Sequence, residues 1–144
     1  MNCAIGIPAF NEEKSIAGII TRLKKKYQTI IVCDDGSSDL TGEIAKELGV
    51  IVITHPKNLG YGGAIRSIFL KSSELQMDAL VTFDADGQHD VNDIDLVLKP
   101  IIEDKVDICI GSRFLEKNDN IPKYRKIGIK TITEITNVST GLKI

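Results

Sequence analysis

The stretch ALVTFDADGQHD, residues 79–90, decides the fold of this chain, because an apolar run leads directly into an acidic loop. The run 79–83 has the length and composition of a buried strand. Asp84 and Asp86 then stand one residue apart where this strand opens into the loop. Such carboxylates suit a cation like Mg²⁺, which takes oxygen ligands and shares substrate phosphates. The alternative is an acidic turn that caps the next helix.

The same order of strand, loop and helix repeats along the chain. Short apolar runs predict strands at 2–7, 29–33, 50–54, 79–83 and 106–110. Amphipathic patterns between them predict helices at 12–26, 41–48, 63–73 and 91–102. This alternation predicts an α/β protein with a mainly parallel open sheet flanked by helices. Because such sheets bind ligands at the carboxyl ends of their strands, we expect the function in the loops found there.

Composition indicates a single globular domain. The chain has 144 residues, of which 42% are hydrophobic and 26% are charged, so it can bury a sizeable core. A net charge of −2 and a pI near 5.7 argue against a nucleic-acid partner. Cys3, Cys33 and Cys109 each fall in a predicted strand, which predicts buried free thiols in a reducing compartment. We find neither a signal-peptide pattern nor an apolar stretch of ~20 residues, and therefore expect a cytoplasmic location.

Two loops supply candidate ligands for a nucleoside. After the first strand, Pro8 and Phe10 can pack on a ligand and Glu12 can accept hydrogen bonds from ribose hydroxyls, although the helix dipole alone favours acidic residues there. After the second strand, Asp39 is predicted to cap the following helix, so Asp35 is a carboxylate that the turn does not need. A base N–H would stabilise Asp35, and a solvated turn is the alternative.

The loop 58–64 and the rest of the acidic loop offer further groups. Glycines before the third helix expose amides that attract anions, but their spacing does not fit a nucleoside-triphosphate loop, and we favour a packing role. Gln88 can add a neutral oxygen to a metal site. For His89, a surface position is the preferred interpretation.

Basic residues follow the fifth predicted strand. Arg113 stands at the strand end, where its guanidinium group can grip a phosphate at two points, and Arg125 lies in a basic stretch beyond it. A solvated basic surface is the alternative. The segment 127–138 is partly helical in period, and it either packs on the sheet or lies on a membrane surface.

Taken together, these loops resemble those of the family 2 glycosyltransferases, and within that family the polyprenyl-phosphate sugar transferases of the dolichyl-phosphate mannosyltransferase type. The likeness spans essentially the whole chain. It rests on five segments in order, which are IPAFNE (7–12), DDGSSD (34–39), NLGYGGA (58–64), DADGQH (84–89) and GSRF (111–114). The resemblance implies the GT-A, Rossmann-like fold of nucleotide-diphospho-sugar transferases.

The resemblance also implies roles for individual residues. The nucleotide-sugar donor would be bound by Pro8, Phe10, Glu12, Cys33, Asp35, Asp84, Ala85 and Asp86. Mg²⁺ or Mn²⁺ on its diphosphate would be held by Asp84, Asp86 and Gln88. The implied catalytic residues are Asp86, Arg113 and Arg125, the two arginines matching positions that bind the acceptor phosphate or the donor diphosphate.

The reaction implied by the resemblance is inverting transfer of a sugar from a GDP-mannose, UDP-glucose or UDP-GlcNAc type of donor to a polyprenyl or dolichyl phosphate. The metal would neutralise the charge on the departing nucleotide diphosphate. A phosphate monoester has a second pKa near ~6, so as the nucleophile it needs no strong protein base. An acceptor hydroxyl would need one, and no acidic residue after Arg113 stands out for that task.

The resemblance further implies how the chain is organised. We expect one catalytic domain over 1–144, with a nucleotide-sugar and metal half at 1–90 and an incomplete acceptor half at 91–144. Family members commonly continue beyond this point, so we expect a C-terminally truncated chain whose full-length form lies peripherally on the cytoplasmic face of a membrane. Phe10 stands where many members have Tyr, and Ile129 where some have a small hydroxyl residue.

Other functions compete with this one. A related transferase would use a sugar or protein hydroxyl as acceptor, and a chain without its acceptor site would bind nucleotide-sugars without catalysis. A Mg²⁺-binding phospho-receiver domain also gathers carboxylates at strand ends. It ranks far behind, because it needs a late Lys where this chain has Ser112 and Arg113, and its acidic pair would follow the first strand. The nucleotide, the sugar and the oligomeric state stay open, with a homo-oligomer as one alternative.

Overall fold

The computed structural model of the chain describes residues 1–87, 89–111 and 133–134. The chain divides into two compact units, Met1–Cys109 and Ile110–Ile144. The first unit contains the sheet and the loops at its strand ends. Gln88, Arg113, Arg125 and Ile129 lie outside the described residues, as does most of the segment 127–138, so the roles expected of them stay predictions.

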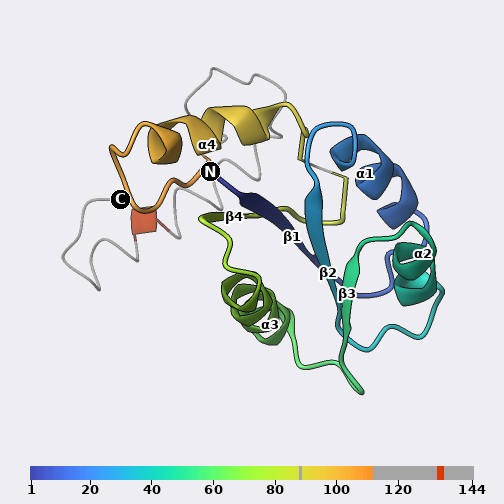
Figure 1. Cartoon of the computed structure of the whole chain (residues 1–144). Helices are drawn as coiled ribbons and strands as arrows, with labels where there is room; N and C mark the ends of the chain where they lie inside the picture. The colour runs from blue at the N-terminus through green and yellow to red at the C-terminus, as the bar shows by residue number, and fades with distance from the viewer. Residues whose placement is uncertain (88, 112–132, 135–144) are drawn as a thin grey trace. The chain divides into compact units, whose positions relative to one another are not determined.

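Strands and helices alternate strictly through the first unit (Figure 1). In chain order they are β1 (Cys3–Ala9), α1 (Ile16–Leu23), β2 (Thr29–Asp34), α2 (Thr41–Glu47), β3 (Ile51–Thr54), α3 (Tyr61–Glu74), β4 (Ala79–Thr82) and α4 (Asp93–Ile102). The predicted strands and helices up to residue 102 are confirmed to within a few residues at each end. None of the helices in the described ranges is long and apolar enough to cross a membrane.

The four strands form one parallel sheet in the order β3-β2-β1-β4. The predicted parallel α/β architecture is therefore confirmed. Because β1 lies at the centre of the sheet, the loop after it borders the loops after both β2 and β4. The strand order thus brings the segments after residues 9, 34 and 82 together at the carboxyl end of the sheet.

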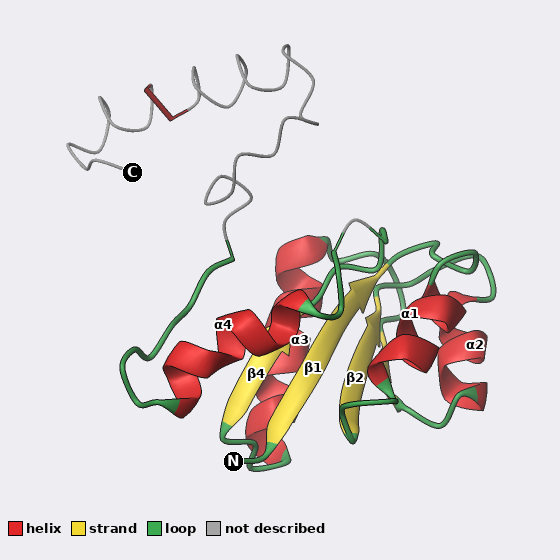
Figure 2. Ribbon diagram, turned by 90° about the horizontal axis from the view of Figure 1, so that it is seen from above, coloured by secondary structure: helices red, strands yellow, loops and turns green. Residues whose placement is uncertain are grey.

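Two hydrophobic clusters cover the two faces of the sheet. Ile5, Ile7 and Ala9 alternate along β1 and pack with residues of α1, α2 and α4. On the other face, Ala4 packs with residues of β2 and with the inner side of α3. Figure 2 shows α3 and the α1–α2 pair on opposite sides of the sheet. Both faces are buried, which explains why the strands are apolar throughout rather than alternately polar.

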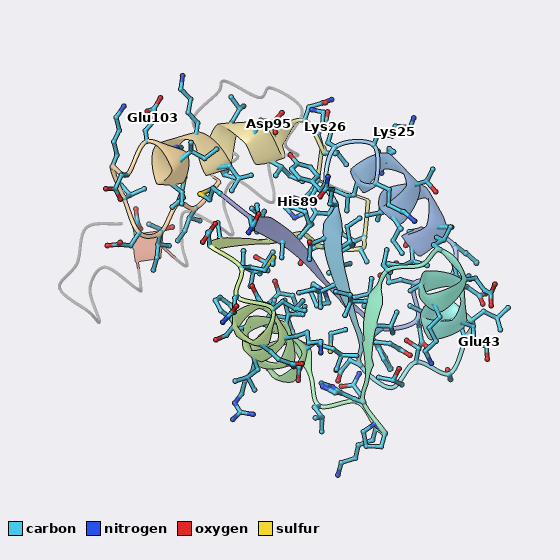
Figure 3. The ribbon with its side chains drawn as sticks, in the orientation of Figure 1. Lys25, Lys26, Glu43, His89, Asp95 and Glu103 are labelled. Atoms are coloured by element: carbon cyan, nitrogen blue, oxygen red, sulfur yellow. The ribbon has the colours of Figure 1, made fainter. Side chains whose placement is uncertain are left out.

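Helix α4 is tied to the end of α1 by a polar cluster (Figure 3). The Tyr27 hydroxyl donates to Asp95 Oδ1 at 2.7 Å, and Lys26 Nζ donates to Asp95 Oδ2 at 3.1 Å. These two bonds, that from Tyr27 first, lower the pKa of Asp95. Burial, followed by the Asp95 carboxylate, raises the pKa of Tyr27. The cluster fixes the first turn of α4, which begins shortly after the acidic loop.

The prediction of a fifth strand at 106–110 is wrong. This segment has no regular secondary structure, and Val106, Ile108 and Ile110 are exposed. A strand is stable only beside a hydrogen-bonded neighbour, and no described segment pairs with the outer edge of β4. All three cysteines are free, as predicted, but Cys109 is exposed and Cys3 is only partly buried, whereas Cys33 is buried.

Candidate active site

The strand register places three functional loops side by side. Ala9 pairs with Asp34, and Asp34 pairs with Thr54, so Phe10, Asp35 and His55 directly follow three neighbouring strand ends. Two backbone bonds extend this register by one step, from Asp35 N to Ala9 O and from His55 N to Asp34 O, each 2.9 Å. The carboxyl ends of parallel strands are where open α/β sheets bind ligands.

A pocket of about 380 Å³ opens at these strand ends. This volume falls within the range of small-molecule sites. Its lining includes seven of the predicted site residues, which are Pro8, Phe10, Glu12, Asp35, Asp84, Ala85 and Asp86. The other lining residues in the described part of the chain are Ala9, Asn58, Tyr61 and Ala64. The fold thus brings these seven predicted residues into one cavity.

The Asp35 carboxylate is held by three donors. It is 3% exposed, and its Oδ1 accepts from the Leu59 amide at 2.9 Å and from His55 Nδ1 at 2.6 Å, while Oδ2 accepts from the Gly60 amide at 2.8 Å. Burial alone would raise the pKa of Asp35, but the bonds from His55, Leu59 and Gly60 outweigh it and lower this pKa. Asp35 is therefore an ionised, oriented acceptor in the pocket wall.

These contacts account for two amides of the loop 58–60. The amides of Leu59 and Gly60 point at a protein carboxylate rather than at an open anion site. The packing role predicted for the glycines fits Gly63, where a Cβ would lie 2.8 Å from Leu59 Cβ, whereas a Cβ at Gly60 or Gly62 would meet no described atom within 4 Å. Gly36, with φ of 73°, lets this loop approach closely, since a Cβ there would lie 2.6 Å from the carbonyl carbon of Lys57. The turn after β2 and the loop before α3 are consequently locked together.

His55 is a site residue that the sequence interpretation missed. It is 8% exposed, and its Nε2 lies 2.8 Å from Ser67 Oγ on α3 and 3.6 Å from Cys33 Sγ. The signal was present, because His55 follows the third strand as Asp35 follows the second. Cys33 itself packs in the core beneath α3, outside the residues that line the pocket, and burial followed by Asp35 and Asp34 raises the pKa of its thiol to about 11.

The loop after β1 is fastened to the turn after β2. The Glu12 amide donates to Thr41 Oγ1 at 2.7 Å, and the Glu13 amide donates to Asp39 Oδ2 at 3.1 Å. Asp39 is not the N-cap of α2 as predicted, because Leu40 occupies that position; Asp39 Oδ1 instead accepts from the Thr41 amide at 3.0 Å. Its side chain therefore links the loop after β1 to the start of α2.

The acidic loop after β4 is more open. Asp86 is exposed, and the Asp84 side chain is 39% exposed. Asp84 Oδ1 accepts from the Tyr61 hydroxyl at 3.1 Å, and Oδ2 lies 3.2 Å from His89 Nε2. The His89 side chain is also 39% exposed, which agrees with the surface position preferred for it, and its ring lies 5.6 Å from that of Phe83. Tyr61 and His89 orient the first carboxylate of the pair.

The donor set fits a divalent cation that is shared with a substrate. In the part of the chain that the structure describes, no group of three or more His, Cys, Asp or Glu side chains forms a closed metal cage. Two carboxylates beside an open pocket are nevertheless the arrangement by which Mg²⁺ binds together with substrate phosphates and water. Asp84 and Asp86 are the residues that would hold such an ion.

The fold and the pocket define a class of protein, which is an open parallel α/β sheet with a polar pocket at the carboxyl ends of its strands. Residues 4–143 match the family described as Glycosyl transferase family 2. The chain belongs to this family. This assignment overturns the phospho-receiver alternative.

Several curated proteins are similar to the chain. It is 44% identical over 138 residues to an uncharacterised protein of Methanocaldococcus jannaschii, covering 94% of this chain and 57% of that protein. It is 40% identical to the UDP-N-acetylglucosamine–dolichyl-phosphate N-acetylglucosaminyltransferase of Methanococcus voltae, with 94% and 62% covered. It is 34% identical to the dolichol-phosphate mannosyltransferase of Pyrococcus furiosus, with 88% and 38% covered. The chain therefore spans roughly 40–60% of the length of these relatives.

Solved structures share the fold. Mannosyl-3-phosphoglycerate synthase from Rubrobacter xylanophilus superposes with a TM-score of 0.60 at 23% identity, covering 72% of this chain and 36% of that one. Glucosyl-3-phosphoglycerate synthase from Mycobacterium tuberculosis, in complex with Mn²⁺, UDP and glucosyl-3-phosphoglycerate, gives 0.58 at 23% identity, with 69% and 39% covered. These likenesses confirm the predicted glycosyltransferase fold.

Proposed function

We propose that the protein transfers a sugar from a nucleoside diphosphate donor to a polyprenyl phosphate, with a divalent cation on the donor diphosphate. One observation carries this proposal: Asp35, an oriented acceptor, lines the same pocket as the carboxylate pair Asp84 and Asp86. A base with an N–H suits the first, and a metal-bound diphosphate suits the second. A nucleoside diphosphate carries both groups.

Different residues along the pocket would bind the base, the ribose and the metal-bound diphosphate. The aromatic face of Phe10, which is 46% exposed, can pack against the base, and Glu12 can accept from ribose hydroxyls while its Oε2 is steadied by the Ser15 hydroxyl at 2.6 Å. Asp84 and Asp86 would hold Mg²⁺ or Mn²⁺, which supplies charge neutralisation of the leaving diphosphate. We propose Gln88 as a third oxygen ligand, with Arg113 and Arg125 on the phosphates.

The names of the relatives support the acceptor. The proteins of Methanococcus voltae and Pyrococcus furiosus are both named for transfer to dolichyl phosphate, and they differ in the sugar. A protein that works on such a lipid would lie at a membrane surface, and we propose the cytoplasmic face.

Ligand-induced stabilisation tests the donor site. We expect UDP or GDP, or their sugar derivatives, to raise the melting temperature of the chain only when Mn²⁺ or Mg²⁺ is present, because binding to the native state shifts unfolding. The variant Asp86→Asn should remove the metal-dependent part of the shift. No shift with any nucleotide and metal would contradict the proposal.

Transfer assays test the acceptor. Incubation with labelled donors and either a short polyprenyl phosphate or sugar acceptors separates the two transferase alternatives. We expect label in the lipid phosphate, with inversion at the anomeric carbon. Label only in a sugar or protein hydroxyl would overturn the acceptor proposal and leave the donor site standing.

A further inference from the structure

A buried hydrogen-bond network lies behind the Asp35 wall of the pocket, and the proposed reaction does not use it. His55 Nδ1 contacts Asp35 Oδ1 at 2.6 Å, and Nε2 contacts Ser67 Oγ at 2.8 Å. Asp35 lines the pocket, whereas His55 is not among the described lining residues. The imidazole therefore acts on a ligand only through Asp35.

The partners of His55 fix the role of each ring nitrogen. An ionised carboxylate only accepts hydrogen bonds, so Nδ1 carries a proton and donates a hydrogen bond to Asp35. In the neutral ring Nε2 is then an acceptor and receives the hydroxyl of Ser67, which α3 holds in place. Ser67 thereby anchors the ring from the side opposite Asp35.

The acceptor capacity of Asp35 is almost filled from within the protein. A carboxylate offers about four acceptor positions, and His55, Leu59 and Gly60 take three of them. Two of these donors share Oδ1, so the remaining position is on Oδ2. Rotation of the carboxylate would exchange the oxygens, and the His55 bond opposes this rotation.

We propose that His55, anchored by Ser67, is a positioning residue for base recognition: it holds Asp35 so that the remaining acceptor position on Oδ2 selects a base with a ring N–H. This inference rests on the proposed function, in which a nucleoside occupies the pocket. Uracil and guanine present such an N–H. Cytosine presents a lone pair at the equivalent ring nitrogen and would face the carboxylate unfavourably.

A purely structural role for His55 makes a different prediction. The network also joins the end of β3 to α3, so its loss could loosen the whole pocket. Such loosening would weaken binding of every nucleotide by a similar factor. If His55 positions Asp35, its loss instead changes the ratio of the affinities for nucleotides with and without a ring N–H.

Two matched substitutions separate the bonds of the ring. In His55→Asn the amide nitrogen can take the place of Nδ1 and still donate to Asp35, whereas in His55→Gln the longer side chain reaches towards Ser67. Ser67→Ala removes the anchor alone. Tyr27→Phe is the control, because it deletes a side-chain hydrogen bond to an Asp carboxylate outside the pocket, between the segment after α1 and the first turn of α4.

Calorimetric titration with UDP, GDP and CDP in the presence of Mn²⁺ gives the result. We expect the wild type, His55→Asn and Tyr27→Phe to bind the better of UDP and GDP at least about tenfold more tightly than CDP, as loss of a charge-assisted bond predicts. In His55→Gln the preference should fall to about threefold or less, and in Ser67→Ala to a value between the two.

Three results would overturn the inference. These are an unchanged preference in both His55→Gln and Ser67→Ala, an equal weakening of all three nucleotides, or a wild type that binds CDP as well as UDP and GDP. If His55→Gln does not fold, Ser67→Ala and His55→Asn decide the matter. A wild type that binds none of the nucleotides would instead refute the proposed function, and the inference with it.

Discussion

The two ends of the pocket differ in how completely the protein itself has built them. At one end Asp35 is 3% exposed and receives three hydrogen bonds from His55 and the loop 58–60. At the other end the Asp84 side chain is 39% exposed, Asp86 is exposed, and Asp84 is oriented by two partly exposed side chains. We call these the base end and the metal end.

The difference shows which contacts are formed by folding alone and which are left for the ligand to complete. The hydrogen bonds of the base end form when the chain folds, because a buried carboxylate must accept its hydrogen bonds from within the protein. The metal end keeps its carboxylates accessible, since a cation shared with a diphosphate has to arrive with the substrate. Substitutions at the base end should therefore cost stability, and those at the metal end should cost ligand binding.

The largest expected effect is at the metal end. Asp86→Asn should lower transferase activity by about 100-fold or more, because several kcal/mol of charge neutralisation depend on the metal. The free energy of unfolding without ligands should change by no more than about 0.5 kcal/mol, since Asp86 is exposed. Initial rates with Mn²⁺ and urea denaturation measure the two quantities. Equal losses of stability and activity would contradict the division between the ends.

The base end should respond in the opposite way. Asp35→Ala is expected to lower the free energy of unfolding by about 3 kcal/mol, because it leaves the buried His55 and the part-buried amides of Leu59 and Gly60 without their acceptor. Urea denaturation of the variant beside Asp86→Asn makes the comparison direct. A loss below that of the Asp86 variant would refute the claim that Asp35 holds the base end together.

Acid should weaken the contribution of Asp35 to stability. The pKa of Asp35 is lowered in the folded chain, so the unfolded chain takes up the proton first as the pH falls. The stabilisation is fully present above the unfolded value of about 3.9 and is lost as the pH drops through the lower folded value. The stability difference between wild type and Asp35→Asn should therefore shrink below about pH 4. A difference that is constant between pH 6 and pH 3 would contradict this.

The smallest effect is expected at Tyr61, which is 61% exposed and donates to Asp84. Tyr61→Phe keeps the ring at position 61 and leaves the contact between His89 and Asp84 in place, so Mn²⁺ affinity in the presence of UDP should weaken by only about tenfold. Titration of both proteins with Mn²⁺ at saturating UDP provides the measurement. A loss as large as that in Asp86→Asn would mean that Tyr61 does more than orient a ligand.

The sequence predicted the fold well where local pattern and burial agree. The segments that form β1 to β4 are apolar because both faces of the sheet are covered. In the helices, the spacing of the apolar residues matches the side that is buried. The run 106–110 has the same local character, yet its apolar residues are exposed in the structure. Local pattern cannot tell whether a neighbouring strand is available.

The candidate site was predictable at the level of loops and less so at the level of contacts. Seven predicted residues line one pocket, because parallel strands end at the same edge of the sheet. His55 was missed, since a single His after a strand carries no motif and its role depends on β3 lying beside β2. Likewise, Asp39 accepts from Glu13 in the loop after β1 as well as from Thr41 at the start of α2, and the first of these contacts depends on β1 lying beside β2.

Paramagnetic resonance of Mn²⁺ tests the central claim most directly, because it reports the bound cation without relying on turnover. The account predicts that UDP or GDP markedly tightens Mn²⁺ binding to the wild type and has no such effect on the Asp84→Asn, Asp86→Asn double variant. Mn²⁺ binding that ignores both nucleotides, or that the double substitution leaves unchanged, would contradict it.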